Sequence, residues 1–167
     1  MGSFNSIDIP RTPSALPALL KTELMIHGHS CCEIKRSNCS IICDPWLIGS
    51  AYWRSWFNFP EVPNFKSLIS NWTEQKEVYF YISHLHWDHF HGPSLRKFEK
   101  FKPTILLPYS CTKRMIVDVK RDFKFSKRLE LRHAKSFLLE DDFEITSYQF
   151  NPVIIDSSLV IDVGGKK

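Results

Sequence analysis

The sequence predicts a single α/β domain in which helices pack against a mixed β-sheet. Its length of 167 residues is typical of one domain with one substantial core. Patterns of buried strands and amphipathic helices alternate over residues 77–124, and strand patterns then follow one another over residues 128–163. Alternation followed by consecutive strands indicates a mixed sheet with helices packed outside it.

The composition is that of a soluble globular protein. Hydrophobic residues make up 43% and charged residues 24% of the chain, and the formal net charge is +4. This mild positive charge does not by itself indicate a nucleic-acid partner. No apolar run is long enough to span a bilayer, so we expect no membrane span. The 5 cysteines include no Cys-x-x-Cys pair and no secretory signal is apparent, which argues against a disulfide framework or zinc knuckle and favours a cytoplasmic location.

The N-terminal part of the chain predicts an arm followed by a hairpin. Residues 1–20 are rich in proline and poor in charge, which is typical of an irregular arm, so we expect the domain over residues 21–167. Two apolar stretches, residues 22–35 and 40–47, predict short strands joined by the polar turn at residues 35–38.

The rest of the chain predicts two helices and several strands. Residues 92–101 begin with Gly92-Pro93, which suits a helix start. Residues 112–124 are amphipathic, and their basic side chains are mixed with Asp118 and Asp122 on a solvated face, so we expect no nucleic-acid partner. Strands are expected over residues 77–83, 103–109, 128–134, 136–150 with a break at the polar turn 140–142, and 157–163.

One short loop, residues 84–91, contains four of the 7 histidines and one aspartate. It follows the buried strand expected over residues 77–83, and ligands bind at such carboxyl ends in open α/β sheets. His84 and His86 are two residues apart, so both side chains point the same way from extended backbone and can bind one ion. Asp88 and His89 follow where the chain bends, and we expect them to face another direction and bind a second ion. Ordinary hydrogen-bonded histidines are the alternative, but this pattern after a buried strand favours a metal site.

These residues also carry a resemblance to a known family. The segment HLHWDH, followed by Gly92, resembles the HxHxDHxxG signature of the metallo-β-lactamase superfamily, and GHSCCEI and SIICDPWL resemble its opening hairpin. Residues 44–61 and 156–165 are most similar to the subgroup related to the non-Rieske part of CMP-N-acetylneuraminate hydroxylase, with sugar-lactone hydrolases as more distant relatives. The resemblance covers the chain from about Leu24 onward. It implies an α/β fold of the αββα sandwich type, of which this chain would contain the N-terminal half to two-thirds.

The resemblance implies direct metal ligation by four residues of the loop, His84, His86, Asp88 and His89. Asp88 would also handle protons as the catalytic residue. Asp44 matches a position beneath the site that orients a histidine, and His29 matches a recurrent position near the site with an unclear role. An ordinary hydrogen-bonded strand histidine is the alternative for His29.

Other ligands of the superfamily have no evident counterpart in this sequence. His133, the one histidine after the loop, is interpreted as structural. The place of the third ligand of the first metal falls near residues 148–156, which offer Asn151 and Asp156 but no histidine. Three explanations remain open: the ligands belong to a missing C-terminal half, they come from a homo-oligomer partner, or the chain is a degenerate member.

The leading functional expectation is a hydrolase with two divalent metal ions, zinc first and iron or manganese next. A metal-bound hydroxide would attack an ester, amide, lactone or phosphodiester of a small-molecule substrate. The alternatives are an iron-dependent oxygenase component acting on a nucleotide sugar, and a truncated non-catalytic subunit or scaffold. The aromatic loop after Asp44 predicts a substrate pocket containing Trp53, Arg54 and Trp56, with a loop that closes the hydrophobic core as an equal alternative.

Overall fold

A computed structural model describes residues 21–62, 65–125, 127–150, 153 and 156–164, so the arm expected over residues 1–20 lies outside the described residues. The strands are β1 Thr22–Gly28, β2 Cys31–Arg36, β3 Cys39–Cys43, β4 Ser50–Ala51, β5 Trp56–Phe57, β6 Glu77–Tyr81, β7 Thr104–Pro108, β8 Lys127–Leu131, β9 Ser136–Glu140, β10 Phe143–Gln149 and β11 Ser157–Val163. The helices are α1 Phe65–Thr73, α2 Gly92–Phe98 and α3 Arg114–Asp122, with short 3₁₀ segments at Tyr52–Arg54 and Glu99–Phe101. No helix within these described ranges is long and apolar enough to cross a membrane.

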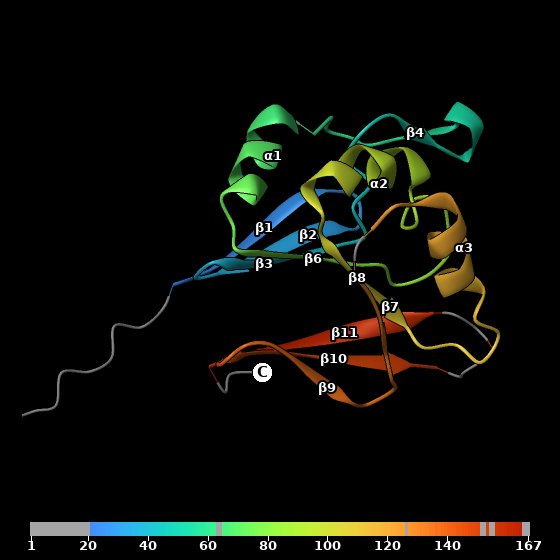
Figure 1. The fold of residues 1–167 in the computed structure, drawn as a ribbon. Coiled ribbons are helices and arrows are strands. Elements are labelled where there is room, and N and C mark those ends of the chain that lie inside the picture. The colour runs from blue at the N-terminus through green and yellow to red at the C-terminus, as the bar shows by residue number, and fades with distance from the viewer. Residues whose placement is uncertain (1–20, 63–64, 126, 151–152, 154–155, 165–167) are drawn as a thin grey trace, which may run out of the picture.

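Helices, a six-stranded sheet and a three-stranded sheet form three layers (Figure 1). The larger sheet has the order β1-β2-β3-β6-β7-β8, in which β1, β2 and β3 are antiparallel and β3, β6, β7 and β8 are parallel. Parallel neighbours need long crossover connections, and α1, α2 and α3 lie within these connections. The smaller sheet, in the order β11-β10-β9, is antiparallel and packs beneath the larger one. The predicted mixed α/β fold is therefore confirmed as a helix–sheet–sheet arrangement.

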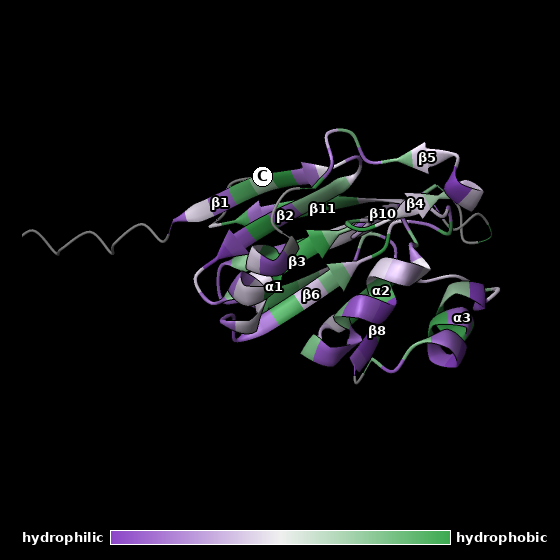
Figure 2. Cartoon of the chain, turned by 90° about the horizontal axis from the view of Figure 1, so that it is seen from above, coloured by the Kyte–Doolittle hydropathy of each residue, from purple (hydrophilic) through white to green (hydrophobic). Residues whose placement is uncertain are grey.

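Two apolar cores form because side chains alternate across the strands of the larger sheet. On β6, Phe80 packs into the core under the helices, whereas Tyr79 and Tyr81 pack into the core between the sheets. Ile42 and Ile41 divide in the same way on β3. In Figure 2, coloured by hydropathy, β3 is mainly hydrophobic, whereas the helices carry hydrophilic bands on their outer faces. Burial on both faces explains why these strands read as continuous apolar runs.

The structure corrects the sequence prediction in two places. The stretch over residues 22–35 is two strands, β1 and β2, which turn at His29 and Ser30, because His29 adopts a left-handed φ of 29°. Helix α1 is not among the elements that we predict from the sequence, although Leu68, Ile69 and Trp72 have helical spacing and pack on the helix-side core. A helix of 9 residues with so narrow an apolar stripe is easily missed.

Polar contacts connect the two sheets at both ends. The Tyr81 hydroxyl on β6 lies 3.3 Å from Ser147 Oγ and 2.6 Å from Ser157 Oγ, which belong to the smaller sheet. Arg36 on β2 donates to both carboxylate oxygens of Asp142, in the turn between β9 and β10. The contact of Tyr81 with Ser157 holds the start of β11 next to the end of β6.

Replacing Phe98 with alanine should remove the centre of the helix-side core. Its fully buried ring lies 5.2 Å from Trp72 and 5.3 Å from Phe80, measured between ring centroids. We expect the free energy of unfolding, measured by urea denaturation, to fall by about 3–5 kcal/mol. Val117→Ala, at a position 53% exposed on α3, is the control and should change it by less than about 1 kcal/mol. Equal effects of the two substitutions would contradict this description of the core.

Candidate metal centre

The candidate site lies at one edge of the larger sheet. β3 and β6 are parallel, so Asp44 and the loop over residues 82–91 leave the sheet at the same edge. β1 and β2 turn at this edge too, because Cys32 at the start of β2 pairs with Cys43 at the end of β3. The fold therefore brings His29, Asp44 and the histidine loop together from three separate parts of the chain.

A buried carboxylate, Asp44, organises the base of the loop. Asp44 is only 6% exposed, and its Oδ1 accepts a 2.7 Å hydrogen bond from the backbone N–H of Ser83. Its Oδ2 accepts from Ser83 Oγ at 2.7 Å and from His89 Nδ1 at 2.8 Å. Because a carboxylate only accepts, Nδ1 of His89 carries a proton, and in the neutral ring Nε2 has the lone pair available for another partner. Asp44 therefore sets both the tautomer and the orientation of His89.

His84 and His86 contact each other at the start of the loop. His84 Nε2 lies 2.9 Å from His86 Nδ1, and the His84 and His89 ring centroids are 4.0 Å apart. Burial, together with the neighbouring His89 and His86, lowers the pKa of His84 below its usual value of 6.5. Its ring is therefore neutral near pH 7 and able to bind a metal ion.

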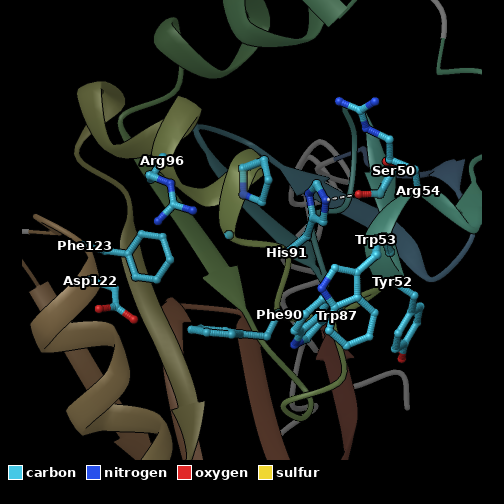
Figure 3. Close-up of a pocket in the computed structure, with 13 residues that line it drawn as sticks. Ser50, Tyr52, Trp53, Arg54, Trp87, Phe90, His91, Arg96, Asp122 and Phe123 are labelled. Carbon is cyan, nitrogen blue, oxygen red and sulfur yellow. Dashed lines mark hydrogen bonds between the residues drawn. The ribbon is translucent and has the colours of Figure 1, made fainter.

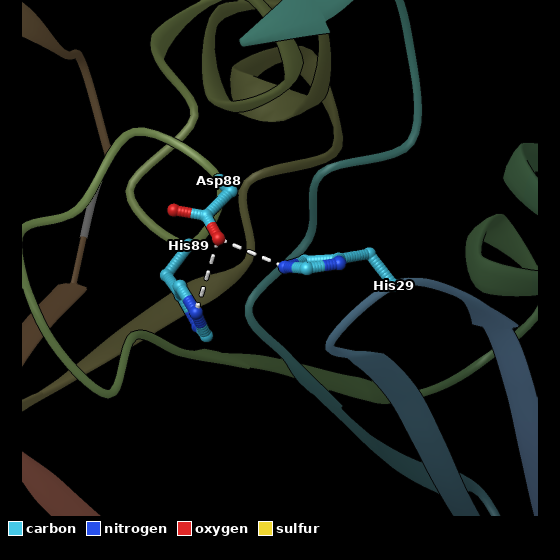
Figure 4. Close-up of side chains that lie close together, drawn as sticks. All are labelled: His29, Asp88 and His89. Atoms are coloured by element: carbon cyan, nitrogen blue, oxygen red, sulfur yellow. Dashed lines mark hydrogen bonds and ion pairs between the residues drawn. The ribbon is translucent and has the colours of Figure 1, made fainter. Parts of the chain in front are cut away.

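Asp88 is held from two sides (Figure 4). Its Oδ2 lies 2.8 Å from His29 Nε2 and 3.5 Å from His89 Nε2, and its Oδ1 accepts a 2.8 Å hydrogen bond from the Tyr52 hydroxyl. Burial would raise the pKa of Asp88, but the hydrogen bonds from Tyr52 and His29 outweigh burial and lower it below 3.8. One ligand atom each from His29, Asp88 and His89 lies within 4.8 Å of the other two.

The structure divides the four motif residues into two groups. His84 contacts His86, while Asp88 and His89 lie near His29, and Asp44 supports His89 from beneath; the rings of His84 and His89, 4.0 Å apart, join the two groups. The fourth histidine of the loop, His91, caps α2 by accepting from the N–H of Ser94.

Of the two residues that the sequence offers near the place of the third ligand, the structure describes Asp156. Asp156 Oδ1 lies 4.0 Å from His84 Nδ1, whereas Asn151 lies outside the described residues. His133 Nδ1 accepts a 3.0 Å hydrogen bond from the N–H of Gln149, at the end of β10.

Tyr52 is the contact that sequence reasoning misses. It lies 36 positions before Asp88, and Tyr52, Trp53 and Arg54 all have left-handed φ values, of 46°, 53° and 70°. Such a run is rare for residues other than glycine, and no local spacing predicts it. The one available signal is a phenol within an aromatic loop, because a buried tyrosine usually needs a partner for its hydroxyl.

The predicted pocket residues lie in different places. Trp53 and Arg54 line a cavity of about 510 Å³ together with Tyr52, Trp87, His91 and Arg96, among others (Figure 3). Trp56 is not among the residues that line it; its ring centroid lies 6.2 Å from that of His29. Trp53 is 82% exposed and its ring lies 4.4 Å from that of Trp87, so it does not close the core.

A smaller cavity opens directly onto the histidines. It has a volume of about 360 Å³ and is lined by His84, Leu85, His86, Thr112, Arg114, Val153 and Asp156. The larger cavity contains none of the candidate ligands His84, His86 or His89, so size alone does not identify the reacting site. The smaller one is the better place for chemistry because two candidate metal ligands, His84 and His86, form part of its wall.

Asp44→Asn should lower the pKa of His89. Burial alone would lower this pKa, but the hydrogen bond and charge of Asp44, with the charge of Asp88, raise it above 6.5. The stabilisation that this pair gives the fold is complete below pH 6.5 and is lost as the pH rises through the raised value. In the variant we expect an NMR titration of the metal-free protein to show His89 titrating at lower pH than in the wild type. An unchanged His89 titration would contradict the role given to Asp44.

Tyr52→Phe should remove a hydrogen bond that fixes the Asp88 carboxylate, without removing a proposed metal ligand. Burial and the neighbouring Asp88 raise the pKa of Tyr52, so its phenol stays protonated and donates to Oδ1. Loss of such a supporting hydrogen bond typically weakens metal binding by about 10–100-fold. Isothermal titration with Zn²⁺ measures the change, with Tyr148→Phe on β10 as the matched control. Equal affinity of the two variants would show that the Tyr52 contact does not support the site.

Comparison with known proteins gives relatives that are similar over part of the sequence. No protein-family model matches the sequence. The chain is 34% identical over 109 residues to the cytidine monophosphate-N-acetylneuraminic acid hydroxylase of Cricetulus griseus and to the human protein described as its inactive form. The match covers 64% of this chain but only 18% and 20% of those proteins. The chain thus spans about a fifth of the length of the curated relatives it matches.

Solved structures share the fold at low sequence identity. CmlA, a diiron β-hydroxylase from Streptomyces venezuelae, superposes with a TM-score of 0.61 at 18% identity, covering 89% of this chain and 29% of CmlA. Igni18, a metallo hydrolase from the archaeon Ignicoccus hospitalis, gives 0.55 at 15% identity, covering 86% of this chain and 57% of Igni18. Together with the sequence relatives, the shared helix–sheet–sheet arrangement shows that this chain has a metallo-β-lactamase-like fold, as expected from the sequence.

Proposed function

We propose that residues 21–167 form one domain of a metal-dependent hydrolase, with His84, His86, Asp88 and His89 as metal ligands. The observation that carries this proposal is the convergence of ring nitrogens and one carboxylate at the carboxyl edge of the larger sheet. His84 Nε2 and His86 Nδ1 are 2.9 Å apart, and His89 Nε2 lies 3.5 Å from Asp88 Oδ2. The shared fold of Igni18, described as a metallo hydrolase, supports it.

The side chains present fit a divalent transition metal. Imidazole and carboxylate ligands suit zinc, iron and manganese. The lowered pKa values of His84 and Asp88 keep the ring neutral and the carboxylate charged, which are the forms that bind metal. We propose two ions with zinc as the first choice, one near His84 and His86 and the other near Asp88 and His89.

The residues around the ions would divide the work of hydrolysis. A bound divalent ion lowers the pKa of a water ligand and polarises the bond under attack. Asp44 binds Nδ1 of His89 and thereby directs Nε2 toward the site. Tyr52 donates to Oδ1 of Asp88, which leaves Oδ2 directed toward the site. Besides binding the ion through Oδ2, the Asp88 carboxylate would accept a proton from the attacking water. A small substrate would lie in the 360 Å³ cavity against His84 and His86.

An iron-dependent hydroxylase component is the second candidate. Two observations favour it: the sequence relatives are hydroxylases of a nucleotide sugar, and CmlA is a diiron hydroxylase of the same fold. The imidazole and carboxylate ligands suit iron as well as zinc. The 167 residues contain no Rieske pattern of Cys and His pairs, so electrons would come from another protein or segment.

Metal content separates an enzyme from a scaffold. We expect the purified chain to hold about one or two equivalents of metal by mass spectrometry, because each group offers two or more ligand atoms. His84→Ala/His86→Ala should lose about one equivalent, while His133→Ala, which removes a histidine of the β8–β9 turn, should retain all of it. Equal metal content in the wild type and in His84→Ala/His86→Ala would contradict the proposed metal ligands and favour a non-catalytic subunit.

The metal-loaded chain should hydrolyse one member of a panel of ester, amide, lactone and phosphodiester substrates. Asp88→Asn should lower kcat/KM by about 10²–10⁴-fold, because it removes a proton acceptor and a charged ligand. Turnover that instead requires iron, dioxygen and an added reductant would select the hydroxylase.

A further inference from the structure

His29 occupies an unusual place for a residue of a β-hairpin turn. Its left-handed φ of 29° turns the side chain away from the sheet and toward the histidine loop (Figure 4). The ring lies between aromatic neighbours, with Trp46 at 5.4 Å and His89 at 5.9 Å between centroids. Its Nε2 is directed at Asp88 Oδ2, 2.8 Å away, although the side chain is 38% exposed to solvent.

The distances around Asp88 Oδ2 match those within a coordination sphere. Nitrogen and oxygen ligands lie about 2.0–2.2 Å from zinc, so adjacent ligand atoms are roughly 2.8–3.6 Å apart for angles between 90° and the tetrahedral value. Asp88 Oδ2 lies 2.8 Å from His29 Nε2 and 3.5 Å from His89 Nε2. His29 Nε2–H donates a hydrogen bond to Asp88 Oδ2, and a metal ion would replace this proton between the two atoms.

His89 and Asp88 each offer one atom to the same point because another residue binds the second polar atom of each side chain. Asp44 holds Nδ1 of His89, and Tyr52 holds Oδ1 of Asp88. His89 Nε2 and Asp88 Oδ2 therefore face His29, and the three ligand atoms lie within 4.8 Å of one another. Two imidazoles and one carboxylate on one side of an ion leave further positions open for water and substrate.

We propose that His29 is a direct metal ligand and that His29, Asp88 and His89 together hold one divalent first-row ion. This inference rests on the proposed function for the binding of metal, and it goes further by adding a ligand from the β1–β2 turn. The ion would then join the first hairpin to the loop after β6. Metal binding should consequently raise the melting temperature of the chain, because an ion that binds only the folded state stabilises it.

The test uses Co²⁺ as the probe with the full metal-free chain. Optical titration gives its affinity, and hyperfine-shifted imidazole N–H signals in the NMR spectrum count the coordinated histidines. The background is His84→Ala/His86→Ala, which isolates the site under study. His29→Ala removes the ring, His29→Gln keeps a donor for Asp88 but no imidazole, and His133→Ala is the histidine control. Circular dichroism checks that each variant folds.

The expected result is that His29→Ala and His29→Gln each weaken Co²⁺ binding more than about 100-fold, beyond the loss of a merely supporting residue. Each should also lose one shifted imidazole signal and the rise in melting temperature, while His133→Ala behaves as its parent. Wild-type affinity in His29→Gln would mean that His29 only orients Asp88, and this would overturn the inference. Unchanged affinity in His29→Ala, with loss in Asp88→Ala, would also overturn it and leave the proposed function standing. A wild-type chain that binds no Co²⁺ would overturn both.

Discussion

The candidate site depends on the satisfaction of one buried charge. A carboxylate taken out of water is costly unless hydrogen bonds replace its hydration, and Asp44 receives three of them, from the N–H and hydroxyl of Ser83 and from His89. The backbone N–H of Asp44 donates in turn to the carbonyl of Tyr81, at the end of β6. Two neighbouring strands and the loop between sheet and helix are thus tied to one side chain. Their carboxyl ends cannot move independently, which gives the ring of His89 a fixed position.

A polarity gradient runs outward from this anchor. Asp44 and Asp88 are buried, His89 is half-buried, and His29 is exposed, so negative charge lies at the base and neutral or cationic rings lie toward solvent. Such an arrangement suits a cation that enters from the solvent side, because the low dielectric at the base strengthens its attraction to the carboxylates. Ser157 extends the base to the smaller sheet, since its hydroxyl donates to the carbonyl of Ser83 at 2.7 Å. The site therefore depends on both sheets, although its ligand atoms all come from the larger one.

The parts of the molecule that could be predicted from the sequence are those that depend on the spacing of residues close together in the chain. Apolar runs identified the central strands, and the periods of α2 and α3 identified their inner faces. The histidine loop was evident because its members lie within eight positions of one another. Contacts between distant segments were not evident: Tyr52 reaches Asp88 across 36 positions, and His29 reaches it across 59. Both depend on left-handed backbone turns, and a residue other than glycine gives no sign in the sequence that it will adopt one.

The left-handed backbone at Tyr52, Trp53 and Arg54 lowers the stability of the fold, while the side chains of these residues serve the site. Each residue other than glycine in this conformation costs roughly 1–2 kcal/mol, and glycine would adopt it freely. Selection for heat resistance alone would therefore favour glycine in this loop. Glycine at position 52 would remove the phenol that donates to Asp88. Glycine at positions 53 and 54 would remove two side chains that line the larger cavity. Substitutions at these three positions that raise thermal stability would therefore weaken ligand recognition. Variants selected for one of the two properties should be screened for the other.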